Sequence, residues 1–287
     1  MRKVIFLMFI LFLFLVIMSA IFTITLKDSP LVGKVALVRV EGPILESKAI
    51  VDEIRGYVKD RSIKAIVLRI NSGGGGVAPS QEIFSEVKRA AAVKHVVVSM
   101  GSVAASGAYY IASPATRIIA NPGTITGSIG VIMEIPNLKE FLDKLGIKTE
   151  VVKSGKHKDM ASVFRGIGKE EREILQGLMN DVHEQFISDV AESRKLPVEN
   201  IRKIADARVF SGKQAIDIGL VDELGDLQHA IKVAATLAGI EGEPEVVSKK
   251  KKSLFLELIE GNITEVFFRL IPKFELKYEF LPQGGIK

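Results

Sequence analysis

Short apolar runs alternate with amphipathic stretches over the first part of the chain, and this alternation limits the possible folds more than any other feature. The apolar runs predict strands at 35–40, 65–70 and 95–100, and the amphipathic stretches predict helices at 47–58 and 79–92. Strands that alternate with helices build βαβ units around a largely parallel sheet. Further helices are expected at 169–193, 201–205, 211–216 and 227–237. The sequence therefore predicts an α/β fold of repeated βαβ units, with helices accumulating toward the C-terminus.

The N-terminus carries an uncharged stretch, residues 4–26, that follows Arg2 and Lys3. About 20 apolar residues span a bilayer as a helix, whereas the apolar core of a secretory signal peptide is shorter. We therefore expect an uncleaved transmembrane anchor that contacts lipid through residues 4–26, with cleavage after Ala20 as the alternative. The positive residues at the start place the N-terminus in the cytoplasm. The rest of the chain is then expected on the outer side of the membrane, in a single-pass protein.

Composition narrows the chemistry that the chain can perform. The chain of 287 residues has no cysteine, which excludes disulfides, thiolate zinc sites and a cysteine nucleophile. Its formal net charge of +5 comes without a basic stripe that carries interleaved aromatic residues, so no nucleic-acid partner is expected. No zinc-protease motif and no nucleotide-binding motif occurs, so we expect neither a metal nor another cofactor.

Two segments contain the residues of a possible nucleophile and base. Ser106 lies among alanines and glycines in residues 101–110, and Lys158 lies in residues 152–159. A serine hydroxyl becomes a good nucleophile when a neighbouring base takes its proton, and a lysine can be that base when its amine is neutral. Gly107 follows the serine, so its unobstructed N–H is a candidate donor to an oxyanion.

A glycine run, residues 71–77, follows the second predicted strand. A phosphate-binding loop would continue into Gly-Lys-Ser/Thr, which this segment does not do. A flexible turn is the simplest alternative. A third interpretation is that the bare backbone lets a substrate strand pass closely and directs an N–H at a developing oxyanion. The position of the run, one βα unit before Ser106, favours this third interpretation.

Four segments resemble the ordered motifs of the signal peptide peptidase A family, in its short single-domain form: residues 70–75, 101–112, 126–131 and 153–159. The resemblance covers roughly residues 33–240. It departs from the family pattern at Gly73, where proline is usual, and at Ala108, where a second glycine is usual. The family is one of membrane-anchored serine proteases with a fold like that of Clp protease and crotonase.

The resemblance implies a Ser-Lys dyad, with Ser106 as nucleophile and Lys158 as general base. It also implies that the Ser128 hydroxyl orients the lysine amine. The oxyanion would be bound by the Gly107 N–H together with that of Gly74 or Gly75.

The resemblance further implies the substrate and the organisation of the chain. The expected activity is cleavage of remnant signal peptides and other apolar peptides at the outer face of the cytoplasmic membrane. A homo-oligomeric ring is expected, in which neighbouring subunits can complete one active site. The expected parts are an anchor at 1–27, a protease domain at 28–245 and a basic, amphipathic segment at 246–287. This last segment could lie on the membrane, contact another subunit, occupy a substrate groove or close the core.

Several residues compete for the catalytic roles. A Ser-His-Asp triad would have to use His157 with Asp159, and an extended backbone there would direct both side chains away from Lys158. Ser102 is a second possible nucleophile, expected at the end of a strand. Tyr109 and Tyr110 are expected to pack the helix that follows Ser106.

Two other functions remain possible from the sequence. One is a protein that binds acyl thioesters through the same glycine-lined oxyanion hole, and the other is a membrane-anchored scaffold. Neither needs Ser106 together with Lys158. Lys153 and Lys156 are expected to be solvated charges.

Overall fold

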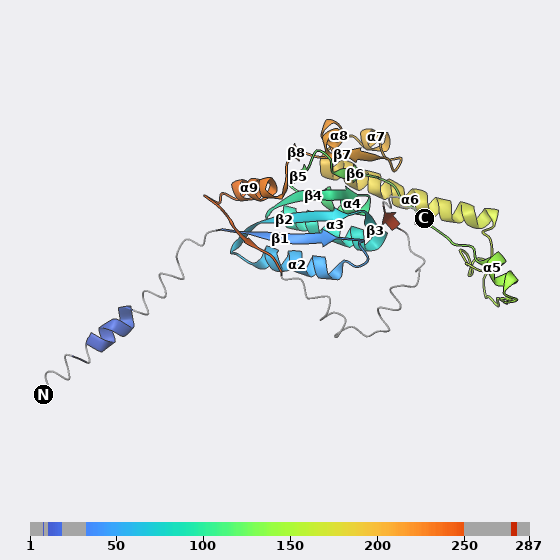
Figure 1. The fold of residues 1–287 in the computed structure, drawn as a ribbon, viewed down its shortest axis with the longest axis horizontal. Coiled ribbons are helices and arrows are strands. Elements are labelled where there is room, and N and C mark those ends of the chain that lie inside the picture. The colour runs from blue at the N-terminus through green and yellow to red at the C-terminus, as the bar shows by residue number, and fades with distance from the viewer. Residues whose placement is uncertain (1–7, 9–10, 19–32, 250–276, 280–287) are drawn as a thin grey trace.

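The computed structural model describes residues 8, 11–18, 33–249 and 277–279 (Figure 1). Residues 11–18 form a helix inside the predicted anchor, most of which lies outside the described residues. Among the helices of the described part, none is both long and apolar enough to cross a bilayer. The anchor therefore stays a prediction.

One sheet of eight strands forms the centre of the molecule. Its order is β7-β6-β4-β2-β1-β9, with β5 paired to both β4 and β8. All neighbours are parallel except β6 and β7, so the predicted parallel sheet is confirmed. The strands are β1 (Lys34–Glu41), β2 (Ile63–Ser72), β4 (His95–Ala105), β5 (Arg117–Ala120), β6 (Ile125–Gly127), β7 (Val209–Ser211), β8 (Glu223–Leu224) and β9 (Glu245–Val247).

Helices cover both faces of this sheet, because the central strands are apolar on both sides. Side chains such as Ala36 and Val38 of β1 join a core with the helices of one face, and Val35 and Leu37 join a second core under α9. The helices of the first face are α2 (Lys48–Lys59), α3 (Val77–Ala91), α4 (Gly107–Ala112) and the C-terminal half of α6 (Lys169–Arg194), while α9 (Leu227–Leu237) covers the other face and α7 (Val198–Arg202) and α8 (Gly212–Asp217) lie near β7 (Figure 1).

Two features differ from the sequence-based expectation. Strand β4 continues to Ala105, so Ser102 lies within the strand and not at its end. The glycine run is not only a turn, because Gly74–Gly76 forms the short strand β3. This strand pairs in antiparallel fashion with β10 (Lys277–Glu279), about 200 residues later in the chain.

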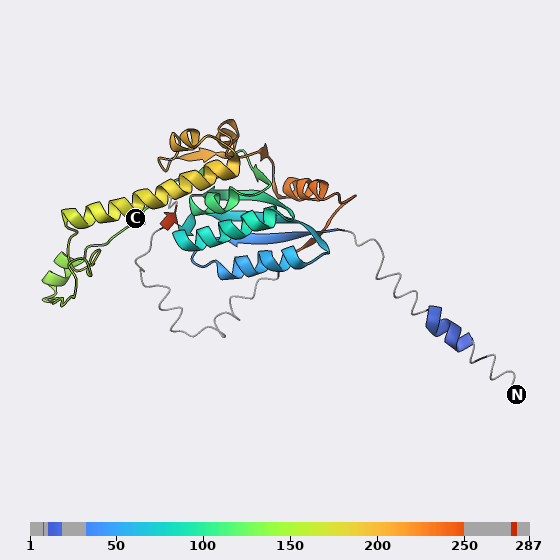
Figure 2. The same ribbon diagram turned by 180° about the vertical axis from the view of Figure 1, so that it is seen from behind.

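A long projection extends from the body of the molecule. Helix α6 has 26 residues, which makes it about 39 Å long. Its N-terminal half and the short helix α5 (Lys139–Lys144) lie beyond the edge of the sheet in both views (Figures 1 and 2). The segment between α5 and α6, which carries Lys158, belongs to this projection.

Candidate active site

Ser106 occupies a strained turn between β4 and α4. Its φ of 55° and ψ of −122° are the angles of the first central residue of a type II′ turn, a position that usually requires glycine. Strained residues of this kind cluster at active sites, and a serine at a sharp strand-to-helix turn is the arrangement of a nucleophile elbow. The residue is only 1% exposed. Its N–H donates to Gly127 O at 2.8 Å, and its carbonyl accepts from the Tyr110 N–H at 2.8 Å.

The residues next to Ser106 in the chain are small, and two tyrosines follow them on the core side. Ala104, Ala105, Gly107 and Ala108 are fully or almost fully buried. On the core side, the Tyr109 hydroxyl donates to Leu220 O at 3.0 Å, and burial raises the pKa of this hydroxyl well above its usual range.

The Tyr110 ring also packs helix α4 against its neighbours. Its centroid lies 4.6 Å from that of Phe84, in a stacked arrangement, and 4.9 Å from that of Phe186, edge to face. Both tyrosines therefore pack α4, as the sequence predicts.

Ser128 lies directly beside Ser106. Strand β6 runs parallel to β4, and its last residue, Gly127, lies opposite Ala105, the last residue of β4. The two serines are the residues that directly follow these strands. Ser128 also has a positive φ, of 52°, and it is 5% exposed. Its N–H donates to Arg208 O at 2.8 Å. Thus two residues that lie 22 positions apart in the sequence both adopt an unfavourable backbone conformation at one point of the sheet.

The glycine strand β3 is held from one side by Ile44. The Ile44 N–H donates to Gly74 O at 2.8 Å, and the Gly76 N–H donates to Ile44 O at 2.9 Å. A Cβ on Gly75 would lie 2.2 Å from Ile44 O, so only glycine fits there. The Gly74 N–H is already engaged by the Ser72 hydroxyl at 3.1 Å. Because the Gly74 carbonyl and the Gly76 N–H face Ile44, the Gly75 N–H faces the other edge of β3, where it pairs with β10, so a substrate could reach it only in place of β10.

The opposite edge of β3 holds a polypeptide strand. Tyr278 lies opposite Gly75, with Lys277 opposite Gly76 and Glu279 opposite Gly74. Strand β10 also lies against α4, the helix that starts after Ser106, and against α3. The edge of β3 thus accommodates an extended backbone next to the candidate nucleophile. The sequence alone could not reveal this pairing, because it joins segments about 200 residues apart.

Lys158 lies in a series of turns, residues 154–161, and its side chain is exposed. In both views its segment is at the far end of the projection, away from the junction of β4 and α4 (Figures 1 and 2). Within residues 33–249, no hydrogen bond or ion pair joins Lys158 to Ser106 or Ser128. One copy of the chain therefore brings the two serines and the glycine strand together, but not the lysine.

The neighbours of Lys158 do not form the alternative triad. Asp159 accepts hydrogen bonds from Lys153 at 2.5 Å and from Arg165 at 2.9 Å, and these hold the pKa of its carboxyl far below the usual range. His157 lies near a different carboxylate, with Nε2 3.5 Å from Glu170 Oε1. The backbone is turned here and not extended, so the geometry on which the triad depended does not occur.

The two nearby lysines were expected to be solvated, and both are exposed residues that also contact acceptors. Lys153 bonds Asp159 and the carbonyl oxygen of Lys156, and Lys156 pairs with Glu170. Both are held by acceptors that lie within the same projection.

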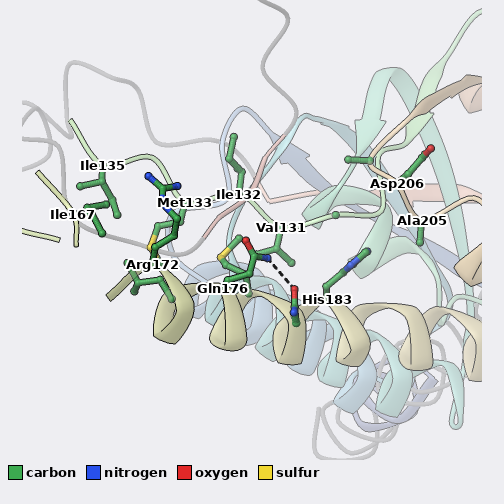
Figure 3. A pocket seen from close by; sticks show the side chains of 15 residues that line it. Val131, Ile132, Met133, Ile135, Ile167, Arg172, Gln176, His183, Ala205 and Asp206 are labelled. Carbon is green, nitrogen blue, oxygen red and sulfur yellow. Dashed lines mark hydrogen bonds between the residues drawn. The ribbon is translucent and has the colours of Figure 1, made fainter. Parts of the chain in front are cut away.

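A separate cavity of about 530 Å³ lies between residues 130–135 and the N-terminal half of α6 (Figure 3). It begins at Gly130, two residues after Ser128, and most of its apolar lining comes from Met133, Ile135, Ile167, Leu175 and Met179. Neither catalytic candidate lines it. Sequence patterns could not identify this cavity, because its walls come from three separate segments.

The fold and the serine elbow are those of an α/β serine hydrolase, and comparisons with known proteins define the family. The model described as peptidase family S49 matches residues 88–241. An inferred protease of Synechocystis sp. is 44% identical over 210 residues, which are 72% of this chain and 76% of that protein.

Two longer relatives match over a similar stretch. Protease 4 of Salmonella typhi is 37% identical over 219 residues, 73% of this chain and 35% of that protein. The chloroplastic serine protease SPPA of Arabidopsis thaliana is 34% identical over 209 residues, 70% of this chain and 31% of that protein. The chain thus spans about a third of the length of these two relatives. It belongs to peptidase family S49 and is a serine protease.

Proposed function

We propose that the chain is a membrane-anchored endopeptidase that cleaves apolar peptides, among them remnant signal peptides, with Ser106 as nucleophile and Lys158 of a second copy as general base. One observation carries this proposal. The strained serine lies beside a glycine strand that pairs, on the edge opposite Ile44, with an extended segment of this chain, which is the main-chain arrangement that a peptide substrate needs.

The chemistry is acyl transfer in two steps. The Ser106 hydroxyl attacks the peptide carbonyl carbon while the neutral Lys158 amine takes its proton. The N–H groups of Gly75 and Gly107 donate to the oxygen of the tetrahedral intermediate. The protonated lysine then gives its proton to the leaving amine, and afterwards activates the water that hydrolyses the acyl-enzyme. Ser128, beside the nucleophile, accepts or donates a hydrogen bond that orients the lysine amine.

The position of Lys158 supports a contribution from a neighbouring subunit. The base lies on a projection, whereas the nucleophile lies in the body at the C-terminal end of β4, so a second copy could bring its projection to the first copy's serine. A head-to-tail contact of this kind closes into a ring when its rotation closes. A ring of identical subunits is therefore part of the proposal.

The apolar N-terminal stretch supports a location at the membrane. Residues 4–26 are long enough to span a bilayer, and the charges before them favour an extracytoplasmic catalytic domain. A protease held there meets peptides that remain in the bilayer after secretion. This setting favours apolar substrates.

The test is hydrolysis of a fluorogenic apolar peptide by the full chain in detergent. Ser106→Ala and Lys158→Ala should each lower kcat by about 10³-fold or more. Ser102→Ala, a change at an exposed serine of the same strand, serves as the matched control and should leave kcat unchanged. Retained turnover in Ser106→Ala would refute the nucleophile, and retained turnover in Lys158→Ala would refute the base.

Mixing the two inactive variants tests the second copy. In an equimolar ring, about a quarter of the sites should combine an intact serine from one copy with an intact lysine from the next, which restores about a quarter of the parent activity. No recovery after verified subunit exchange would refute the intersubunit site.

A further inference from the structure

The guanidinium of Arg165 is saturated by acceptors next to Lys158. Its Nε–H donates to Asp159 Oδ2 at 2.9 Å, and Nη2 donates to the Asp159 carbonyl oxygen at 3.1 Å. Nη1 and Nη2 also donate to the two carboxylate oxygens of Glu171, at 2.8 Å and 2.5 Å, and Nη1 donates to Gly166 O at 3.0 Å. Five donors thus meet five acceptors, which is the full capacity of an arginine side chain.

Glu171 connects this cluster to the rigid part of the molecule. It lies in the first turn of α6, is 8% exposed and also accepts from the Gly168 N–H at 3.1 Å. The same helix continues into the core, where Phe186 and Val190 are fully buried. A bidentate arginine bridge to such a carboxylate fixes orientation as well as distance.

Asp159 connects the cluster to the lysine, because the two residues are adjacent in the chain. The turns that lead to Lys158, residues 154–156, are exposed, so no buried contact orders that side of the lysine. The Lys158 ammonium itself has no hydrogen-bonding partner within residues 33–249. The backbone of Lys158 is therefore fixed from one side, while its amine remains available.

We propose that Arg165, together with Asp159 and Glu171, is a positioning residue that holds the Lys158 backbone so that the amine can be presented to Ser106 of a neighbouring subunit. This inference rests on the proposed Ser-Lys mechanism. A base delivered by a projecting segment must be ordered before the subunits meet, since its misplacement by about 1 Å can cost about 100-fold in rate. Arginine suits this role better than lysine, whose ammonium has no planar fork and cannot form the bidentate bridge to Glu171 while it also holds Asp159.

Arg165→Lys is the informative variant, because it keeps the positive charge and removes the bridge. In the full chain it should lower kcat by about 100-fold and leave KM nearly unchanged, since the substrate strand binds at β3. Lys156→Gln is the matched control. It breaks the exposed pair with Glu170 in the same segment and should keep the parent kcat.

Placement of the variant in mixed rings separates positioning from a general loss of stability. Ser106→Ala and Lys158→Ala copies are mixed, with Arg165→Lys added to either one. When Arg165→Lys is placed on the Ser106→Ala copy, which supplies the lysine, most of the recovered activity should be lost. When Arg165→Lys is placed on the Lys158→Ala copy, which supplies the serine, the recovered activity should not change. Equal loss in both placements, or no loss in either, would overturn the inference.

The unmodified mixture reports on the proposed function separately. If the parent is active and the mixture of Ser106→Ala and Lys158→Ala is inactive, the proposed intersubunit site is refuted. The Arg165→Lys variant alone then tests the role of Arg165. A lower kcat at unchanged KM and unchanged melting temperature then supports positioning, and an unchanged kcat refutes it.

Discussion

At the scale of single residues, the candidate active site depends on backbone conformations that few residues tolerate. Ser106 and Ser128 both have positive φ angles, and Gly75 has no room for a side chain. Such conformations are unfavourable for non-glycine residues and persist only where neighbouring contacts enforce them. Here the hydrogen bond from Ser106 to Gly127 and the bonds of Ile44 to β3 provide those contacts.

Gly75→Ala tests this dependence directly. The added Cβ would lie 2.2 Å from the carbonyl oxygen of Ile44, so β3 must move. We expect a loss of about 1–3 kcal/mol in the free energy of unfolding together with a large loss of kcat. Chemical denaturation and peptide hydrolysis measure the two effects.

Gly56→Ala is the control for this change. It lies in α2 with open space around it, and it should be neutral or stabilising by up to about 1 kcal/mol. If Gly75→Ala behaved in the same way, the tight contact between β3 and Ile44 would not matter.

The sequence predicted Ser106 and Ser128 as site residues, but not why they meet. Their types and the small residues around them are visible in the sequence, whereas their strain and contact arise from the pairing of β4 with β6. Arg165 was missed for a similar reason. It belongs to no motif by itself, and its role depends on two carboxylates that the fold brings to it.

At the scale of elements, the periodic segments were predicted well and the glycine strand was not. Strands β1, β2 and β4 and helices α2, α3, α6 and α9 follow from apolar periodicity, because their side chains enter the core. Strand β3 has no side chains to form a pattern, and its partner β10 is distant in sequence. Pairing of this kind is decided by the whole fold.

The ion pair between Arg165 and Glu171 should also affect how the free energy of unfolding depends on pH in the acid range. The guanidinium and the Gly168 N–H lower the pKa of Glu171 to about 2, from an ordinary value of 4.5, and Arg165 also lowers that of Asp159. Carboxyls with lowered pKa values stabilise the fold above their unfolded pKa, and this stabilisation is lost as pH falls toward the folded pKa. The free energy of unfolding should therefore fall between about pH 5 and pH 2.

Arg165→Ala should reduce this acid dependence, because both carboxyls then titrate nearer their ordinary values. Urea unfolding at pH 6 and pH 3 measures it. The control is Lys139→Ala, which breaks an exposed pair in α5 and should leave the dependence unchanged. Equal acid sensitivity in the parent and in Arg165→Ala would contradict the account.

At the scale of the whole molecule, the chain's own C-terminal segment and a substrate peptide would compete for one edge. Residues 277–279 pair with β3, and a tethered segment has a high effective concentration at its site. Removal of residues 250–287 should therefore lower the apparent KM for an apolar peptide.

A matched pair of single changes isolates the main-chain contact. Tyr278→Pro removes an N–H from β10 and should lower KM as truncation does, whereas Tyr278→Ala keeps the backbone and should change KM less. Identical KM values for the parent, the truncated chain and Tyr278→Pro would show that β10 does not compete with substrate.

The division of labour between body and projection is the central feature of the whole molecule. The body holds the proposed nucleophile, its neighbouring serine and the proposed substrate edge, and the projection holds the proposed base with its ion-pair cluster. This division could not be predicted from the 52-residue spacing of Ser106 and Lys158, because spacing alone does not say which subunit supplies each residue.

The most direct test of the account is identification of the acylated residue. The full chain is incubated with an activated ester of an apolar peptide, quenched in acid, and fragmented for mass spectrometry. The account predicts one acyl group, on Ser106, that is absent from Ser106→Ala and appears in Lys158→Ala only after mixing with Ser106→Ala. Acylation of Ser102 or Ser128, or turnover of the ester without any acylated Ser106, would contradict it.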